Sequence, residues 1–255
     1  MESILKVKDL CKTYIVNKRQ NNVLRNVSFE VGKGEMLAVM GPSGSGKSTL
    51  LYTVSGMDTP TSGEVDFCGS DIAKMNAGEL SKLRLDRMGF IFQQMYMLKN
   101  LTVLDNIILP AFQSKENTKS RKEKLADGQR LMKKLGIAQI ADNDINEVSG
   151  GQLQRACICR SMINSPQMIF ADEPTGALNR AASDEVMEEL IKLNAEGTTV
   201  MLVTHDVLVA AKCKRVLYIV DGNIKGEYTL GEYDVAAGMR GRERVLAGWL
   251  MEMGW

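Results

Sequence analysis

The sequence has no excess of charge of either sign. Among its 255 residues, 32 Lys and Arg are balanced by 31 Asp and Glu, which leaves a formal net charge of +1. A surface dedicated to nucleic acid needs a marked local excess of basic residues, so the balance argues against such a partner. We therefore expect no nucleic-acid partner.

Long hydrophobic runs are also missing. No window reaches the roughly 18 uncharged apolar residues of a membrane span. The most apolar region, Thr198 to Ala211, is interrupted by His205 and Asp206. The first residues, Met1-Glu2-Ser3, lack the basic and then apolar layout of a secretory signal. We expect a soluble protein without direct membrane insertion, so that any membrane role requires a partner.

Cysteines are few and scattered. The 5 cysteines, at positions 11, 68, 157, 159 and 213, form an odd set without a pairing pattern, which is typical of reduced thiols in a cytosol. Cys157 and Cys159 lie two residues apart in a predicted helix and therefore point to different faces. We interpret both as small core residues and not as ligands.

The residues that are present favour an ordered α/β protein. Hydrophobic residues make up 44% of the chain and charged residues 25%, and the length allows one large α/β domain or two small ones. The short apolar run Met36 to Met40 is typical of a strand buried on both faces. Strands that alternate with helices predict a mostly parallel sheet covered on both sides.

The order of the predicted elements divides the chain. Strands are predicted at 4–14, 23–31, 36–40, 63–67, 88–92, 168–171 and 199–204 and in a hairpin over 216–228 that turns at Asp221-Gly222; helices are predicted at 47–55, 101–109, 119–135, 151–163, 181–195 and 207–212. Residues 94–165 are mainly helical and read as an insert. We expect one domain over 1–231, with a core of 1–93 and 166–231, followed by a helical extension over 232–255.

A glycine-rich stretch after the strand at 36–40 carries the first chemistry. Gly41, Pro42, Ser43, Gly44, Ser45, Gly46, Lys47 and Ser48 fit the pattern G-x-x-x-x-G-K-S, and Thr49 follows. Backbone N–H groups of such a loop surround phosphate oxygens, and the next helix adds its dipole. Lys47 is suited to reach the β- and γ-phosphates of a nucleotide, and the Ser48 hydroxyl to bind Mg²⁺. The alternative, a chance Gly/Ser turn, does not account for a strand before the loop and a helix after it.

Two acidic residues, Asp172 and Glu173, follow a predicted strand at the edge where parallel sheets present catalytic groups. Asp172 is placed to hold Mg²⁺, and Glu173 to orient or deprotonate an attacking water. The alternative for the pair is a solvated acidic strand end, which the phosphate loop upstream disfavours.

With these motifs, and with the sequence Ser149-Gly150-Gly151-Gln152 between them, the chain resembles the ATP-binding cassette (ABC) ATPases over nearly its whole length, to about Tyr228. The resemblance implies a P-loop, RecA-like core of mostly parallel strands with N-terminal antiparallel strands and an inserted helical subdomain. It also implies ATP and Mg²⁺ as cofactors.

The resemblance assigns a role to each motif. It implies that Tyr14 stacks on adenine, that Gly41 to Thr49 bind phosphate and that Gln93 senses Mg²⁺ and γ-phosphate. It further implies that the signature consists of Ser149, Gly150, Gly151 and Gln152 and that the D-loop consists of Gly176 to Asn179. Finally, it implies that Asp172 binds the metal, that Glu173 is the catalytic base and that His205 contacts γ-phosphate. Without the resemblance, Tyr14 is as well explained as a core residue, whereas His205, the only histidine, ends an apolar strand on the same edge as Asp172.

Two positions depart from the family pattern. The signature usually opens with Leu, and here Val148 stands there, which is a packing change. The D-loop usually ends in Asp, and here it ends in Asn179, which keeps hydrogen bonding but loses the charge. The second departure bears on the coupling between two nucleotide sites and not on hydrolysis.

Within the family, three segments resemble the ATPases of macrolide-efflux, lipoprotein-release and bacitracin- or lantibiotic-resistance transporters: 92–98, 101–107 and 174–178. This implies two copies that enclose two ATP·Mg²⁺ head to tail and drive a separate membrane permease of the mechanotransmission type, on the inner face of the cell membrane. Antimicrobial-peptide resistance or export and the handling of lipid-linked substrates both fit.

Other interpretations remain. A soluble ABC ATPase that acts mechanically on ribosomes or DNA usually carries two cassettes or a long coiled-coil insert, and neither is visible. A regulatory module that binds ATP without useful hydrolysis is disfavoured by Glu173 and His205. The C-terminal segment 240–255 has apolar residues at helical spacing and fits a helix that packs on its own domain, on a permease or on the second ATPase.

Overall fold

The computed structural model describes residues 2–234 and 239–255 of the chain. Its contacts divide the chain into two compact units, one of Met1–Leu80 with Thr199–Trp255 and the other of Ser81–Thr198. Unit 1 is therefore built from the two ends of the chain, and unit 2 from its middle. Helix α2 (Ala77–Arg87) runs across the boundary.

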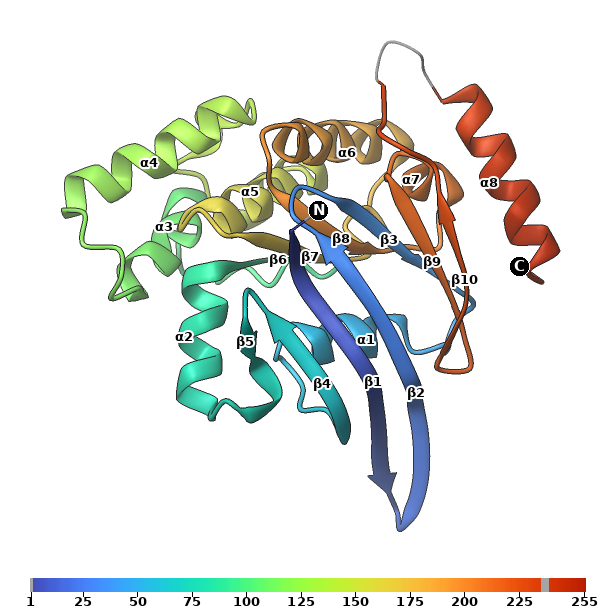
Figure 1. Cartoon of the computed structure of the whole chain (residues 1–255). Coiled ribbons are helices and arrows are strands. Elements are labelled where there is room, and N and C mark those ends of the chain that lie inside the picture. Colours follow the sequence, from blue (N-terminus) through green and yellow to red (C-terminus); the bar gives the residue numbers. More distant parts are fainter. Residues whose placement is uncertain (1, 235–238) are drawn as a thin grey trace. The chain divides into compact units, whose positions relative to one another are not determined.

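The first sheet of unit 1 is antiparallel, in the order β2-β1-β4-β5. Its strands are β1 (Ser3–Val16), β2 (Arg19–Gly32), β4 (Ser62–Phe67) and β5 (Ser70–Asp71), and a 3₁₀ turn, η1 (Ile72–Lys74), follows. Strands β1 and β2 form the long hairpin in Figure 1. In β2, Val27, Phe29 and Val31 are buried, whereas Ser28 and Glu30 between them are exposed, which is the alternation expected of a half-buried strand.

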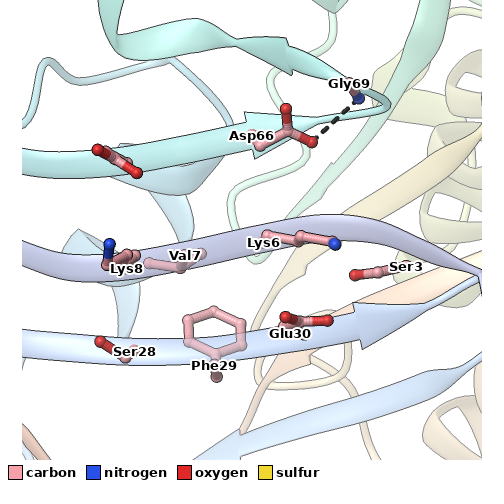
Figure 2. A pocket seen from close by; sticks show the side chains of 10 residues that line it. Ser3, Lys6, Val7, Lys8, Ser28, Phe29, Glu30, Asp66 and Gly69 are labelled. Carbon is pink, nitrogen blue, oxygen red and sulfur yellow. Dashed lines mark hydrogen bonds between the residues drawn. The ribbon is translucent and has the colours of Figure 1, made fainter.

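The outer face of this sheet carries a shallow hollow, shown in Figure 2, that is lined mainly by polar side chains of β1, β2 and β4. Lys6 lies opposite Glu30 on one side and Asp66 on the other, and Lys8 lies opposite Glu64. Cross-strand pairs of opposite charge are a usual way to stabilise a solvent-facing sheet. We therefore interpret the hollow as part of the charged, solvent-facing surface of the sheet.

The second set of strands in unit 1 is mostly parallel. Strand β3 (Met36–Met40) pairs in parallel with β8 (Thr199–Val203) and with β9 (Arg215–Val220), and β9 pairs antiparallel with β10 (Asn223–Thr229). Every residue of β3 and β8 is buried, as predicted for a strand covered on both faces. The β9–β10 turn falls at Asp221 and Gly222, which have φ angles of 48° and 76°. Helices α1 (Lys47–Val54) and α7 (Val207–Ala210) complete this part.

The C-terminal helix α8 (Arg240–Glu252) packs on its own unit, beside β9 and β10 (Figure 1). Leu246 and Leu250 are fully buried, and the Trp249 ring lies 6.3 Å from Tyr218 and 5.3 Å from Tyr228. The Arg242 guanidinium donates to the backbone carbonyls of Ala211, Cys213, Leu230, Gly231 and Glu232. Of the interpretations given above for the C-terminal segment, the structure shows the one in which the helix packs on its own part of the chain.

Unit 2 contains two parallel strands and four helices. Strands β6 (Met88–Phe92) and β7 (Met168–Asp172) pair in parallel. The helices are α3 (Val103–Gln113), α4 (Arg121–Lys134), α5 (Gly150–Met162) and α6 (Arg180–Ala195), with 3₁₀ turns η2 (Ala138–Ile140) and η3 (Ile145–Glu147). Cys157 and Cys159 are fully buried in α5, and burial raises the pKa values of their thiols to about 11 and about 12. Both are core residues, as predicted.

Two helices differ from expectation. Helix α2 was not predicted, because the segment has no apolar stripe and its one buried residue is Asp86. Helix α3 continues through Pro110 to Gln113, although proline usually ends a helix. Apart from these, an N-terminal antiparallel sheet and mostly parallel strands with helices confirm the predicted α/β class.

Candidate nucleotide site

The phosphate loop joins β3 to α1 in unit 1 as predicted. Gly46 is the N-cap of α1 with a φ of 100°, no side chain caps the helix, and its first turn has no acidic residue. A Cβ atom on Gly46 would lie 2.9 Å from the Val23 carbonyl oxygen, so a larger residue fits neither the backbone nor the space. The positive end of the helix dipole thus faces no carboxylate of its own first turn.

Lys47 bends back across the loop. Its Nζ donates to the carbonyl oxygens of Gly41 and Pro42 at 2.8 and 2.9 Å. An ammonium held at the start of a helix adds a full positive charge to the dipole, and this combination is the usual chemistry of phosphate binding.

The loop is buttressed from β9 and from the β9–β10 turn. A Cβ atom on Gly41 would lie 2.1 Å from the Ile219 carbonyl oxygen, and the Gly222 N–H donates to the Ser45 carbonyl at 3.0 Å. The Ser45 hydroxyl is buried and has no partner among the described residues. A rigid glycine cradle with a spare buried hydroxyl fits an anion such as a triphosphate.

His205 belongs to the same unit. Strand β8 pairs with β3 so that Val203 lies opposite Val39, and the Thr204 N–H donates to the Val39 carbonyl at 3.1 Å. His205 and Gly41 therefore both follow the carboxyl ends of neighbouring parallel strands. The His205 side chain is exposed, and Asp206 after it caps α7 through a 2.7 Å bond from the Leu208 N–H.

In unit 2, the residues predicted to act on Mg²⁺ and water follow paired strands. Phe92 lies opposite Asp172, so Gln93 and Glu173 come next on adjacent strands. A Cβ atom on Gly176 would lie 2.9 Å from Gln93 Nε2 and 3.4 Å from Glu173 Cβ, which places both side chains around this glycine. Glu173 has a φ of 47°, a strained value for a non-glycine residue that is frequent at active sites.

The signature begins helix α5. The Ser149 hydroxyl accepts from the Gln152 N–H at 3.3 Å, and Gln152 Oε1 accepts from the Ser149 N–H at 3.0 Å. This reciprocal arrangement is a capping box, which the sequence Ser-x-x-Gln encodes but which the sequence-based interpretation missed. A hydroxyl that accepts from its own helix keeps its hydrogen for another acceptor, so the cap orients Ser149 without consuming its donor.

Asn179, where the family pattern has Asp, is the N-cap of α6. Its Oδ1 accepts from the Ala182 N–H at 3.0 Å. Asn and Asp are about equally good at this position, so the departure leaves the cap intact.

Tyr14 lies in unit 1, half-buried on β1. Its hydroxyl donates to Asp58 Oδ2 at 2.5 Å, and Lys12 Nζ donates to Asp58 Oδ1 at 2.6 Å. Sequence reasoning missed Asp58, because no spacing rule links residues from the end of α1 to a strand that precedes it.

Arg160 was also missed. From α5 its guanidinium donates to the Met95 carbonyl at 2.6 Å and to the Tyr96 carbonyl at 2.8 Å. Met95 and Tyr96 have φ angles of 24° and 46°, so the arginine holds a strained segment that follows Gln93.

Within the described part of the chain, no group of three or more His, Cys, Asp or Glu could hold a metal ion. The predicted metal residues Ser48, Gln93 and Asp172 offer a hydroxyl, an amide oxygen and a carboxylate. Hard oxygen ligands in small number suit Mg²⁺, which usually keeps several waters and substrate phosphates as ligands. This donor set therefore fits Mg²⁺ better than a transition metal.

A family model described as ABC transporter matches residues 24–176. The chain is 39% identical over 233 residues to the uncharacterized ABC transporter ATP-binding protein YknY of Bacillus subtilis, covering 90% of this chain and 100% of that protein. It is also 39% identical over 250 residues to the macrolide export ATP-binding/permease protein MacB of Shigella flexneri, covering 98% of this chain and 38% of that protein. The chain thus belongs to the ABC transporter family, although it spans little more than a third of that MacB.

Solved structures agree. A dimeric post-hydrolysis state of the ATP-binding cassette MJ0796, bound to ADP and Pi, has a TM-score of 0.83 and 37% sequence identity, covering 90% of this chain and 100% of that one. A second dimeric structure of MJ0796, described as a bacterial ABC transporter cassette, gives the same TM-score with 38% identity.

Among the described residues, no helix is long and apolar enough to cross a membrane.

Proposed function

We propose that this chain is the ATP-hydrolysing subunit of an ABC transporter and works as a dimer of cassettes. The observation that carries the proposal is the phosphate loop, an uncapped, acid-free helix start with Lys47 folded over it. The match to a dimeric cassette bound to ADP and Pi supports both the hydrolysis and the dimer.

In this proposal the residues have distinct tasks. One copy acts on the nucleotide through Lys47, Ser48, Gln93, Asp172, Glu173 and His205. The γ-phosphate of that nucleotide also meets Ser149 and Gly151 of the other copy. Bound Mg²⁺ would be held by Ser48, Asp172 and Gln93 and would neutralise phosphate charge. Glu173 orients and deprotonates the attacking water, and His205 donates to the γ-phosphate.

The partner is a membrane permease. We place the cassette on the inner face of the cell membrane, held there by a permease of the mechanotransmission type that grips the cassette near Gln93. Support comes from the MacB relative, whose name joins ATP binding to a permease for macrolide export in one protein. We propose antimicrobial-peptide resistance or export, or the handling of a lipid-linked substrate, as the task of the pair.

Replacement of the proposed base tests the function. We expect Glu173→Gln to lower the rate of ATP hydrolysis by about 10²- to 10⁴-fold, the scale of general-base catalysis, while MgATP still binds. Glu185→Gln is the matched control, since Glu185 lies in unit 2 and pairs with Arg155 at 3.1 Å. Full activity of Glu173→Gln would remove Glu173 from this role, and no hydrolysis by the wild type with its permease would refute the function.

A further inference from the structure

Three side chains of unit 1 form a compact cluster beside the phosphate-loop helix. Asp58 accepts from Lys12 Nζ at 2.6 Å and from the Tyr14 hydroxyl at 2.5 Å, using one carboxylate oxygen for each. Lys12 Nζ also donates to the Thr59 carbonyl at 2.6 Å and lies 4.7 Å from the centroid of the Tyr14 ring. The tyrosine is thus held at its tip by a carboxylate, while an ammonium covers one face of its ring.

The position of Asp58 is fixed by the end of α1. The N–H groups of Met57 and Asp58 both donate to the Tyr52 carbonyl, at 2.9 and 3.0 Å, and the Thr59 N–H donates to Asp58 Oδ1 at 2.8 Å. The start of the same helix is the phosphate loop. Thr49 at that start is close enough to Tyr14 to influence it, acting to lower the pKa of the phenol. One helix therefore positions both the phosphate loop and the anchor of the aromatic ring.

The protonation states agree with these roles. Burial alone would raise the pKa of the Asp58 carboxyl, but hydrogen bonds from Lys12 and Tyr14 bring the pKa below its usual value. Burial, together with Asp58, raises the pKa of Tyr14, so the phenol stays protonated and keeps donating. The Lys12 residue is 8% exposed, and a lysine so buried needs a charged partner. The ion pair between Lys12 and Asp58, however, does not explain why the Tyr14 hydroxyl also binds Asp58.

We propose that Asp58 is a positioning residue for nucleotide binding, which fixes the plane of the Tyr14 ring as a platform for the adenine base. The proposal rests on the proposed function. A free tyrosine would lose side-chain entropy on stacking, whereas a ring fixed at its tip loses little. Lys12 covers one face of the ring, which leaves the other face as the stacking surface.

Titration calorimetry of the full-length chain with two probes tests the proposal. Asp58→Asn replaces one carboxylate oxygen with an NH2 group and removes the negative charge, so the hydrogen bonds that anchor the ring are weakened. We expect the dissociation constant of MgATP to rise about five- to tenfold, the scale of one hydrogen bond of ordinary strength. The constant of magnesium tripolyphosphate, which has no base, should change less than about twofold, because the phosphate loop is untouched.

The control is Asp71→Asn. Asp71 also belongs to unit 1 and pairs with a lysine, Lys74, at 2.7 Å, and its side chain is 26% exposed against 30% for Asp58. Asp71→Asn should leave the ratio of the dissociation constants of MgATP and magnesium tripolyphosphate at the wild-type value. If Asp58→Asn weakens the binding of both probes equally, or of neither, Asp58 does not act through the base and the proposal fails.

Tyr14→Phe keeps the test decisive if Asp58→Asn does not fold. It retains the ring and removes only the bond to Asp58, so it should also raise the MgATP constant about fivefold and spare tripolyphosphate. An unchanged MgATP constant would overturn the proposal. A wild-type chain that binds tripolyphosphate but not MgATP would instead refute the proposed function.

Discussion

Two helix starts that are both expected to meet a γ-phosphate are built in opposite ways. Helix α1 begins at Gly46 without a side-chain cap, whereas α5 begins with the capping box of Ser149 and Gln152. A helix start without a side-chain cap leaves its first N–H groups available to an anion bound by the same unit. A capped start has the N–H groups of Ser149 and Gln152 already satisfied, and it keeps the Ser149 hydroxyl hydrogen and the N–H groups of the two glycines between them to offer. The difference suggests that α1 binds the nucleotide first and that α5 meets it only when a second copy arrives.

The largest effect should come from breaking α1. Gly46→Ala forces a left-handed alanine against the Val23 carbonyl, so the free energy of unfolding should fall by about 1–3 kcal/mol. MgATP binding should be lost with it. Thermal denaturation and calorimetry measure the two effects.

Gly150→Ala at the start of α5 is the matched change. Gly150 does not have a positive φ, and its Cβ atom would lie 3.3 Å from a flexible leucine, Leu178, so the melting temperature should stay close to that of the wild type. Equal destabilisation by the two alanines would contradict the contrast between the helix starts.

A smaller effect is expected from the cap of α5. Ser149→Ala removes the cap and should cost about 1 kcal/mol of stability. Ser149→Asp restores a good cap but directs a carboxylate at the partner's nucleotide, so it should regain the stability and still lose ATP-dependent dimerisation. Sedimentation of a Glu173→Gln background with MgATP measures the dimer.

A single-copy role for α5 makes a different prediction for these variants. In that case Ser149→Asp would weaken MgATP binding to the monomer as much as it weakens the dimer. Calorimetry at concentrations below dimerisation separates the two cases.

The smallest effect is expected at α6. Asn179→Asp exchanges one good N-cap for another and adds a charge near the helix start, so the free energy of unfolding should change by less than about 1 kcal/mol. Asn179→Ala, which has no cap, should lose about 1 kcal/mol. If Asp destabilised the chain as much as Ala, the cap seen at Asn179 would not account for the departure from the family pattern.

Sequence reasoning recovered the elements with strong local signals. The strands Met36–Met40 and Met88–Phe92 have the predicted bounds, and the turn at Asp221 and Gly222 is where it was predicted. Helix α2 was missed because charged residues dominate it and no periodic apolar face marks it.

The site was predicted unevenly for a related reason. Motif residues such as Lys47 and Glu173 could be found because their chemistry depends on short spacing. Asp58 and Arg160 could not, because each acts on a segment distant in the sequence through a contact that only the fold creates.

The discontinuity of unit 1 has a consequence for synthesis. Strand β3, which leads into the phosphate loop, has both its neighbours, β8 and β9, in the last quarter of the chain. A nascent chain therefore makes the loop early, yet the strands that support it leave the ribosome only after all of unit 2. Pairing over such a sequence separation is slow, and the half-finished sheet exposes strand edges. Unit 2, being continuous, is free to fold first, and ATP-binding competence should be the last property that a newly made chain acquires.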